Sequence, residues 1–120
     1  DPQGETKITA LGELLGGRRF RFSAFQLPTR HPGRFYALSM DVVRFSSARD
    51  TYILFQKNPQ MVRLILTDEE KFRLIDEGVV PKNFRSRTIP FITARSAFIR
   101  YGHSLIEKGK PVVDDYYEAE

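Results

Sequence analysis

The segment from Phe84 to Gly102, FRSRTIPFITARSAFIRYG, constrains the fold of this chain more than any other segment. Pro90 fits only within the first turn of a helix and Gly102 suits a helix end, so the sequence predicts a helix from Thr88 or Ile89 to Gly102. At about 100° per residue, apolar side chains cover well over half of the circumference of this helix. A helix with so wide an apolar face must pack against other elements on more than one side.

Arg95 lies in the gap between the two apolar groups of the predicted helix, and the pattern therefore directs its side chain toward the interior. A buried guanidinium needs a paired and hydrogen-bonded partner, because its desolvation is otherwise too costly. We expect an internal structural ion pair in which Asp50 or Asp114 is the partner, with Asp115 as a further candidate. Two alternatives stay open, in which Arg95 reaches a partner protein or a phosphate group.

Two strands joined by a long loop are predicted in the first third of the chain. Residues 18–25 alternate between apolar and polar side chains, as in a half-buried strand. Proline and glycine make 28–33 a loop, and residues 34–40 return as a second strand. The sequence therefore predicts a β-hairpin with a long tip, and residues 5–9 are a candidate for a short edge strand.

The middle of the chain is predicted to contain two short helices and a strand. A helix is expected over residues 40–45, and Asp50 is placed to cap a second segment, 51–57, for which a strand is the alternative. Residues 61–66 are typical of a strand.

A capping box marks the next helix. Thr67 can accept a hydrogen bond from a backbone amide, and Glu70, three residues further on, can reach back to the amide of Thr67. The helix that follows is predicted to run to about residue 77, where Gly78 is the natural stop.

These elements predict one α+β domain over residues 1–120, in which short antiparallel strands and hairpins pack against two or three helices. A last hairpin is predicted within 104–113, with Pro111 restricted to an edge position. Because the first residue is Asp1 rather than methionine, we expect the domain to be a fragment of a longer chain. No apolar run approaches the length of about 20 residues that spans a bilayer, so no membrane partner is expected.

The positive charge of the chain is concentrated in its middle. Between Arg18 and Arg100 there are sixteen lysines and arginines against seven acidic residues, a net charge of +9, whereas the whole chain carries +4. Such a region suits nucleic acid, and it suits an acidic protein partner equally well. The candidate contacts with a partner or with phosphate are three arginines in or near the predicted helix and two tyrosines of the acidic tail: Arg85, Arg87, Arg100, Tyr116 and Tyr117.

The sequence offers little for catalysis. There is no cysteine, which excludes thiolate chemistry and cysteine-ligated zinc. His31 lies in a proline/glycine loop and His103 follows a helix stop, and neither belongs to a ligand motif such as HExxH. The sequence contains no GxSxG, Walker-type or GxGxxG motif. We therefore expect no enzymatic activity, no cofactor, no metal site and no small-molecule substrate.

Several short motifs resemble those of a known family. They occur in the expected order along nearly the whole chain: LLGGR (14–18), RDTYILF (49–55), GVVP (78–81), FRSR (84–87), TARSAF (93–98) and VVDDYYE (112–118). With these motifs the chain resembles the fungal accessory-subunit family shared by the RSC and SWI/SNF chromatin remodellers, of the type represented by RSC subunit seven.

The resemblance implies a non-catalytic subunit of an ATP-dependent chromatin-remodelling complex, nuclear and involved in transcription regulation, that holds neighbouring subunits together. The ATPase would be another chain. By analogy, the expected partners are the SWIRM/SANT-type scaffold subunits and the N-terminal region of the ATPase. The alternative is a module whose basic middle makes weak, direct contact with DNA or the nucleosome.

Overall fold

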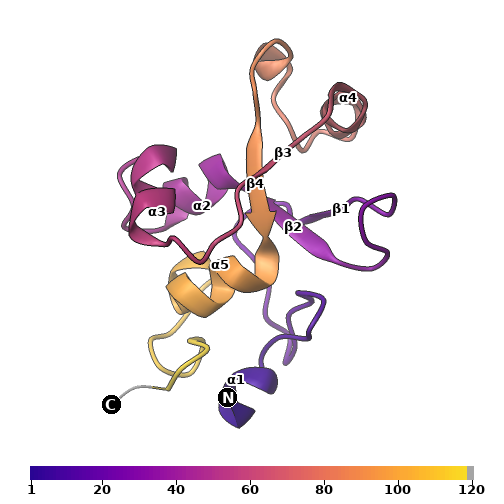
Figure 1. Cartoon of the computed structure of the whole chain (residues 1–120). Helices are drawn as coiled ribbons and strands as arrows, with labels where there is room; N and C mark the ends of the chain where they lie inside the picture. The colour runs from indigo at the N-terminus through magenta and orange to yellow at the C-terminus, as the bar shows by residue number, and fades with distance from the viewer. Residues whose placement is uncertain (119–120) are drawn as a thin grey trace.

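The computed structural model describes residues 1–118. Within them, four short strands form one antiparallel sheet in the order β1-β2-β4-β3. The helices and strands, shown in Figure 1, are α1 (Pro2–Glu5), β1 (Phe25–Gln26), β2 (Phe35–Leu38), α2 (Ser39–Phe45), α3 (Thr51–Lys57), β3 (Leu64–Ile65), α4 (Asp68–Asp76), β4 (Pro90–Thr93) and α5 (Ala94–Tyr101), with 3-10 turns η1 (Lys82–Phe84) and η2 (Gly102–Leu105). The predicted α+β class is confirmed.

The predicted hairpin with a long tip is confirmed, although its first strand is shorter than expected. Phe25 pairs with Tyr36, and the loop between β1 and β2 includes the predicted 28–33. Residues 19–21 lie instead beside 105–107, where Phe20 forms an antiparallel bridge with Ile106. The first half of the predicted strand therefore pairs with the C-terminal part of the chain, which sequence alternation alone could not reveal.

The prediction of one helix from residue 88 or 89 to Gly102 is wrong in its first part. Residues 90–93 form β4, the strand between β2 and β3, and Pro90 is its first residue, a position where a missing amide is tolerated in a sheet. Phe91 and Ile92 are both fully buried, because both faces of β4 are covered. When a short segment is buried on both sides, most of its residues are apolar, and periodicity cannot distinguish a strand from a helix.

Thr93 marks the start of α5, since its hydroxyl accepts a hydrogen bond from the amide of Ser96. We predict that Thr93→Ala lowers the free energy of unfolding of the 120-residue chain by about 1 kcal/mol, the usual effect of losing an N-cap. Mid-helix, the same change would be neutral or slightly stabilising. Urea unfolding measures the difference, and Thr88→Ala, at an exposed position, is the control that should change little.

The other predicted helices are confirmed. Helix α2 begins one residue before the predicted start. The Asp50 carboxylate accepts a hydrogen bond of 2.8 Å from the amide of Ile53, so 51–57 is a capped helix and not a strand. Both hydrogen bonds of the capping box between Thr67 and Glu70 are present at the start of α4. These signals are local, and the sequence alone was enough to read them.

Two predicted β elements near the chain ends are wrong. Residues 2–5 form α1, so the candidate edge strand at 5–9 is not formed, and Ile8 makes only a single bridge, with Leu14. No hairpin forms within 104–113 in the part of the chain described. The carboxylates of Asp114 and Asp115 accept hydrogen bonds from backbone amides of 110–112, which fold this segment into turns instead.

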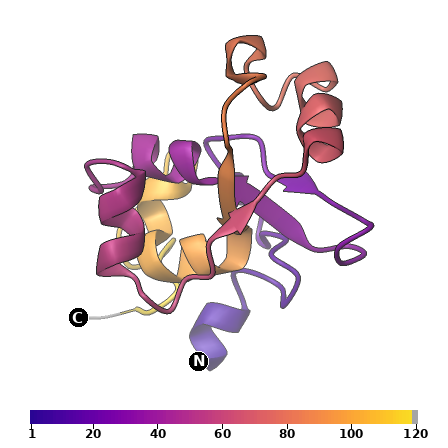
Figure 2. The same ribbon diagram turned by 45° about the horizontal axis from the view of Figure 1, so that its top comes forward.

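The sheet separates two clusters of buried side chains. Phe91 and Tyr36 face the first cluster, which α4 covers with Leu74. Ile92 faces the second, to which α2, α3 and α5 contribute side chains such as Leu54. Figures 1 and 2 show α2 and α3 beside α5. Residues 68–87, which include α4 and η1, form an arm that projects from the other end of β4.

A third cluster joins the two ends of the chain. It consists of Ile8, Phe98, Ile106 and Tyr116, so residues of the N-terminal segment, α5 and the C-terminal segment pack together. In both views the described chain ends lie beyond α5, away from the arm. Both terminal segments are thereby part of the folded core.

Candidate functional site

Arg95 forms an ion pair, but with a partner different from those predicted. Its guanidinium donates to both carboxylate oxygens of Glu5, at the end of α1, and to the carbonyl oxygen of Thr9 at 3.2 Å. Asp50 and Asp114 are wrong as partners: Asp50 caps α3, and Asp114 lies 2.8 Å from the Nε atom of Arg18.

The position of Arg95 follows from the strand-to-helix junction. Because α5 begins only at Ala94, Arg95 lies in its first turn and faces the N-terminal segment. Its side chain is 26% exposed, so the prediction that it projects into the interior is also wrong. The sequence did not indicate Glu5 as the partner of Arg95, because the two residues are 90 positions apart and no sequence pattern links them.

Tyr116 is a buried structural residue, contrary to its prediction as a partner contact. It is 4% exposed, its hydroxyl donates to Glu5 at 2.6 Å, and it accepts from the amino group of Asp1 at 3.2 Å. A Cβ atom at Gly4 would lie 2.3 Å from the tyrosine ring, so only glycine allows this approach. Its neighbour Tyr117 is 58% exposed and keeps its place as a candidate contact.

Lys7 completes the connection between the chain ends. It is 3% exposed, and its ammonium group donates to the carbonyl oxygens of Val112 and Asp115 and lies 3.0 Å from a carboxylate oxygen of Glu118. Asp115 in turn accepts from the amide of His103 at 2.7 Å. We call this connected set the terminal clasp: Glu5, Lys7, Arg95, Asp115 and Tyr116.

The clasp shifts the pKa values of its members. Hydrogen bonds from Arg95 and Tyr116 lower the pKa of Glu5, and the bond to Glu5 raises the pKa of Arg95 and of Tyr116. Burial alone would raise the pKa of Asp115, but hydrogen bonds from the amides of His103 and Val112 lower it. The charged forms of both carboxylates are therefore favoured in the folded chain.

Protonation of Glu5 should weaken the clasp. Because its pKa is lower in the folded than in the unfolded chain, its contribution to stability is complete above the usual value of 4.5 and is lost as pH falls through the folded value. We predict that Glu5→Gln is less stable than the wild type at neutral pH, and that the difference narrows below about pH 4.5. Thermal unfolding from pH 7 to pH 3 measures this, and a constant difference would contradict it.

The predicted arginine contacts lie in two separate places. On the arm, Arg85 stacks over Phe72 with 4.3 Å between the guanidinium carbon and the ring centre, and Arg87 lies 4.7 Å from the ring centre of Phe84. Both are exposed. Arg100, on α5, donates to the side chain of Asn58 at 2.8 Å. The three arginines therefore do not form one binding site.

Two apolar grooves meet at the loop of residues 60–63. The α3 groove encloses about 640 Å³ and is lined by Thr51, Tyr52, Phe55, Gln56, Arg63, Thr88 and Pro90. The α5 groove encloses about 480 Å³ and is lined by Gln60, Met61, Ser96, Ile99, Arg100 and Tyr117. In the sequence, Val62 stands between Met61, which lines the α5 groove, and Arg63, which lines the α3 groove. We call these residues together the two-groove surface.

The most exposed large hydrophobic residues of the described chain belong to this surface. Tyr52 is 72% exposed, Val62 67% and Tyr117 58%. Sequence reasoning named Tyr117 and missed the other two, because Tyr52 and Val62 stand in segments that also supply core residues. Large exposed apolar residues that cluster beside grooves are typical of protein-interaction sites.

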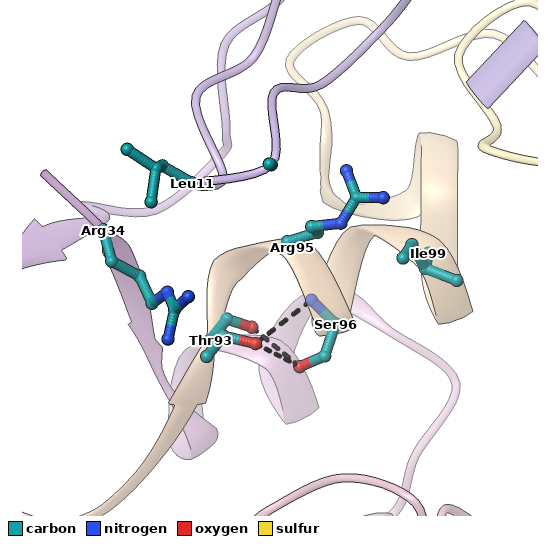
Figure 3. A pocket seen from close by; sticks show the side chains of 7 residues that line it. Leu11, Arg34, Thr93, Arg95, Ser96 and Ile99 are labelled. Atoms are coloured by element: carbon teal, nitrogen blue, oxygen red, sulfur yellow. Dashed lines mark hydrogen bonds between the residues drawn. The ribbon is translucent and has the colours of Figure 1, made fainter. Parts of the chain in front are cut away.

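A third groove, of about 390 Å³, adjoins the α5 groove through Ser96 and Ile99. Figure 3 shows Arg34 pointing toward Thr93 and Ser96, whose hydroxyl groups are hydrogen-bonded to each other at 2.9 Å, while Arg95 points away from them. Leu11 forms the opposite rim. This groove is more polar, and Arg95 on its lining is held by Glu5 and Thr9, which lie outside it.

The described residues contain no group of three or more histidine, cysteine, aspartate or glutamate side chains that could hold a metal ion. Among residues 1–118, no helix has the length and apolar character needed to cross a membrane. The geometry thus defines an α+β domain with clasped ends and an exposed apolar surface.

Comparison with known proteins places this domain among the subunits of chromatin remodelling complexes. The family described as "Chromatin remodelling complex Rsc7/Swp82 subunit" matches residues 1–120, and the chain belongs to this family. The resemblance stated from the sequence motifs is therefore confirmed. No solved structure matches the chain.

Relatives from both kinds of complex share the domain. The chain is 44% identical over its whole length to "Chromatin structure-remodeling complex subunit RSC7" of Saccharomyces cerevisiae and covers 27% of that protein. It is 38% identical to the subunit rsc7 of Schizosaccharomyces pombe, of which it covers 30%. It is 33% identical over 99% of its length to "SWI/SNF global transcription activator complex subunit SWP82" of Saccharomyces cerevisiae and covers 19% of it. The chain thus spans less than a third of each of these relatives.

Proposed function

We propose that this chain is a non-catalytic assembly domain of a nuclear, ATP-dependent chromatin-remodelling complex, in which it holds neighbouring subunits together. The observation that carries the proposal is the two-groove surface, on which Tyr52, Val62 and Tyr117 are more than half exposed. Burial of apolar surface contributes about 25 cal/mol per Å², so covering these side chains would stabilise a complex. Large apolar residues at the centre of an interface commonly carry much of its binding energy.

The partners follow by analogy with the family. We propose contacts with the SWIRM/SANT-type scaffold subunits and with the N-terminal region of the ATPase, which supplies the catalysis. Support comes from the relatives, which are named as subunits of RSC and SWI/SNF complexes. The terminal clasp suits this role, because a surface that lies beside α5 is held rigid when both chain ends are bound to that helix.

The test is co-purification through the full-length protein that carries the domain. Complexes are washed at about 100 mM and then about 400 mM salt in the presence of nuclease, and the retained proteins are identified by mass spectrometry. We expect remodeller subunits to remain at high salt without nucleic acid, because apolar interfaces depend little on ionic strength. Retention of nucleic acid alone, and only at low salt, would overturn the proposal.

A second candidate function is contact with DNA through the arm. Lys82, Arg85 and Arg87 are exposed on the arm, which projects from the rest of the domain. Affinity that depends on phosphate contacts falls with salt, with a logarithmic slope of about −0.9 per phosphate neutralised. Under this alternative, exchanging the two arginines for alanine would reduce both the affinity for nucleosomal DNA and its salt slope. Under the first function, exchanging Arg85 and Arg87 for alanine would leave the retention of remodeller subunits unchanged.

A further inference from the structure

Arg63 lines the two-groove surface, and two further basic residues, Arg49 and Lys57, lie within two residues in sequence of side chains that line it. Between residues 49 and 63 there are three basic residues and one acidic residue, Asp50. The Asp50 carboxylate already caps α3. None of these three basic residues forms an ion pair within residues 1–118, and all three are exposed: Arg49, Lys57 and Arg63.

Arg63 joins the charge to the apolar surface directly. It lines the α3 groove, with its guanidinium carbon 6.0 Å from the ring centre of Phe55, and it directly follows Val62. Excess positive charge beside exposed apolar side chains is complemented by a segment that carries both apolar and acidic residues. A nucleic acid would satisfy the charges but would leave Tyr52 and Val62 without apolar contacts.

One edge of the sheet, strand β3, already accepts a hydrogen bond from a side chain of this domain. Arg30 donates to the carbonyl oxygen of Ile65, in edge strand β3, at 2.7 Å, and the Glu70 carboxylate holds Arg30 by bonds of 2.7 and 2.9 Å. An additional strand paired with β3 would have to displace this arginine. The surface therefore suits recognition of side chains in its grooves better than strand addition.

We propose that the two-groove surface binds a segment of a neighbouring protein subunit in which apolar side chains are flanked by aspartate or glutamate. The apolar side chains enter the α3 and α5 grooves on either side of Val62. The acidic residues pair with Arg63 and with Arg49 or Lys57 at the border. This inference rests on the proposed assembly function and adds to it the chemistry of the partner and the place where it binds.

Photo-crosslinking in the assembled complex tests the proposal. The photoreactive residue p-benzoylphenylalanine replaces Tyr52 or Val62 in the full-length protein, and crosslinked peptides are sequenced. The matched control is Val113, which is 56% exposed but lines neither groove. We expect positions 52 and 62 to crosslink to one acidic, apolar segment of another subunit and position 113 not to do so. Crosslinks to DNA, to a second copy of the chain, or to a segment without acidic residues would overturn the proposal.

A charge-reversal experiment follows from the crosslink. The crosslinked segment is made as a labelled peptide, and its affinity for the full-length protein is measured by fluorescence anisotropy. Arg63→Glu should weaken binding by about tenfold, and exchanging an acidic residue of the peptide for lysine should restore much of it. Arg19→Glu, which changes an exposed arginine far from the grooves in sequence, is the control and should have little effect. Equal effects of both variants would overturn the role of Arg63.

The two proposals fail in different ways. If no remodeller subunit co-purifies with the wild-type protein, the assembly function is refuted. If the subunits co-purify but positions 52 and 62 give no crosslink to them, the assembly function stands and the inference about this surface is refuted.

Discussion

Exchange of Phe91 for alanine is expected to destabilise the chain by about 3–5 kcal/mol, the range for removing a buried aromatic side chain. Phe91 is fully buried in β4, and its ring packs edge-on against Tyr36 at 5.2 Å and against Phe25 at 5.8 Å. Its loss leaves a cavity in the first core cluster, and these neighbours sit on strands that cannot easily move inward to fill it.

The measurement is urea unfolding of the 120-residue chain, followed by circular dichroism. Ile99 is the control, because it is a smaller apolar residue of the same apolar segment and is only partly buried, beside two grooves. Ile99→Ala should cost clearly less than Phe91→Ala. Equal losses would mean that the segment packs as a helix with a continuous apolar face, as the periodicity first predicted, and not as strand β4 followed by α5.

The success of sequence reasoning here depended on how far apart the interacting residues are. The caps at Asp50 and Thr67 need only three or four neighbouring residues, so their helices were predicted correctly. The hairpin of β1 and β2 was found for the same reason, since its strands follow one another in the chain. In β4, by contrast, burial on both faces removed the periodicity, and the strand was predicted to be a helix.

The candidate site was harder to predict, because its geometry depends on contacts across the whole chain. The pair of Arg95 with Glu5 spans 90 positions, and the hydrogen bond of Tyr116 to Glu5 spans 111. Asp114 was expected to pair with Arg95 and pairs with Arg18 instead. The residue types therefore predicted that ion pairs form, whereas only the fold determines which partners meet.

Gly102→Ala is expected to destabilise the chain by about 2–4 kcal/mol, through two effects that act together. Gly102 has a φ of +52° and a ψ of −125°, outside the left-handed helical region, and such a conformation costs a residue with a Cβ atom about 1–3 kcal/mol. An added Cβ would also lie 2.1 Å from an oxygen of Asp115, which must then move away from the amide and ring of His103. The partly buried amide of His103 would lose its acceptor, a further loss of about 1 kcal/mol.

Gly78 provides a control in which the added Cβ atom meets no neighbour. Its φ is +79°, so alanine is strained there as well, but nothing lies within 4 Å of the position of the added Cβ atom. Gly78→Ala should therefore show only the backbone cost of about 1 kcal/mol. The excess loss in Gly102→Ala then reports the displacement of Asp115 together with the less favourable backbone conformation of Gly102. If the two losses are equal, Asp115 can move without cost, and its contact with His103 does not contribute to the stability of the domain.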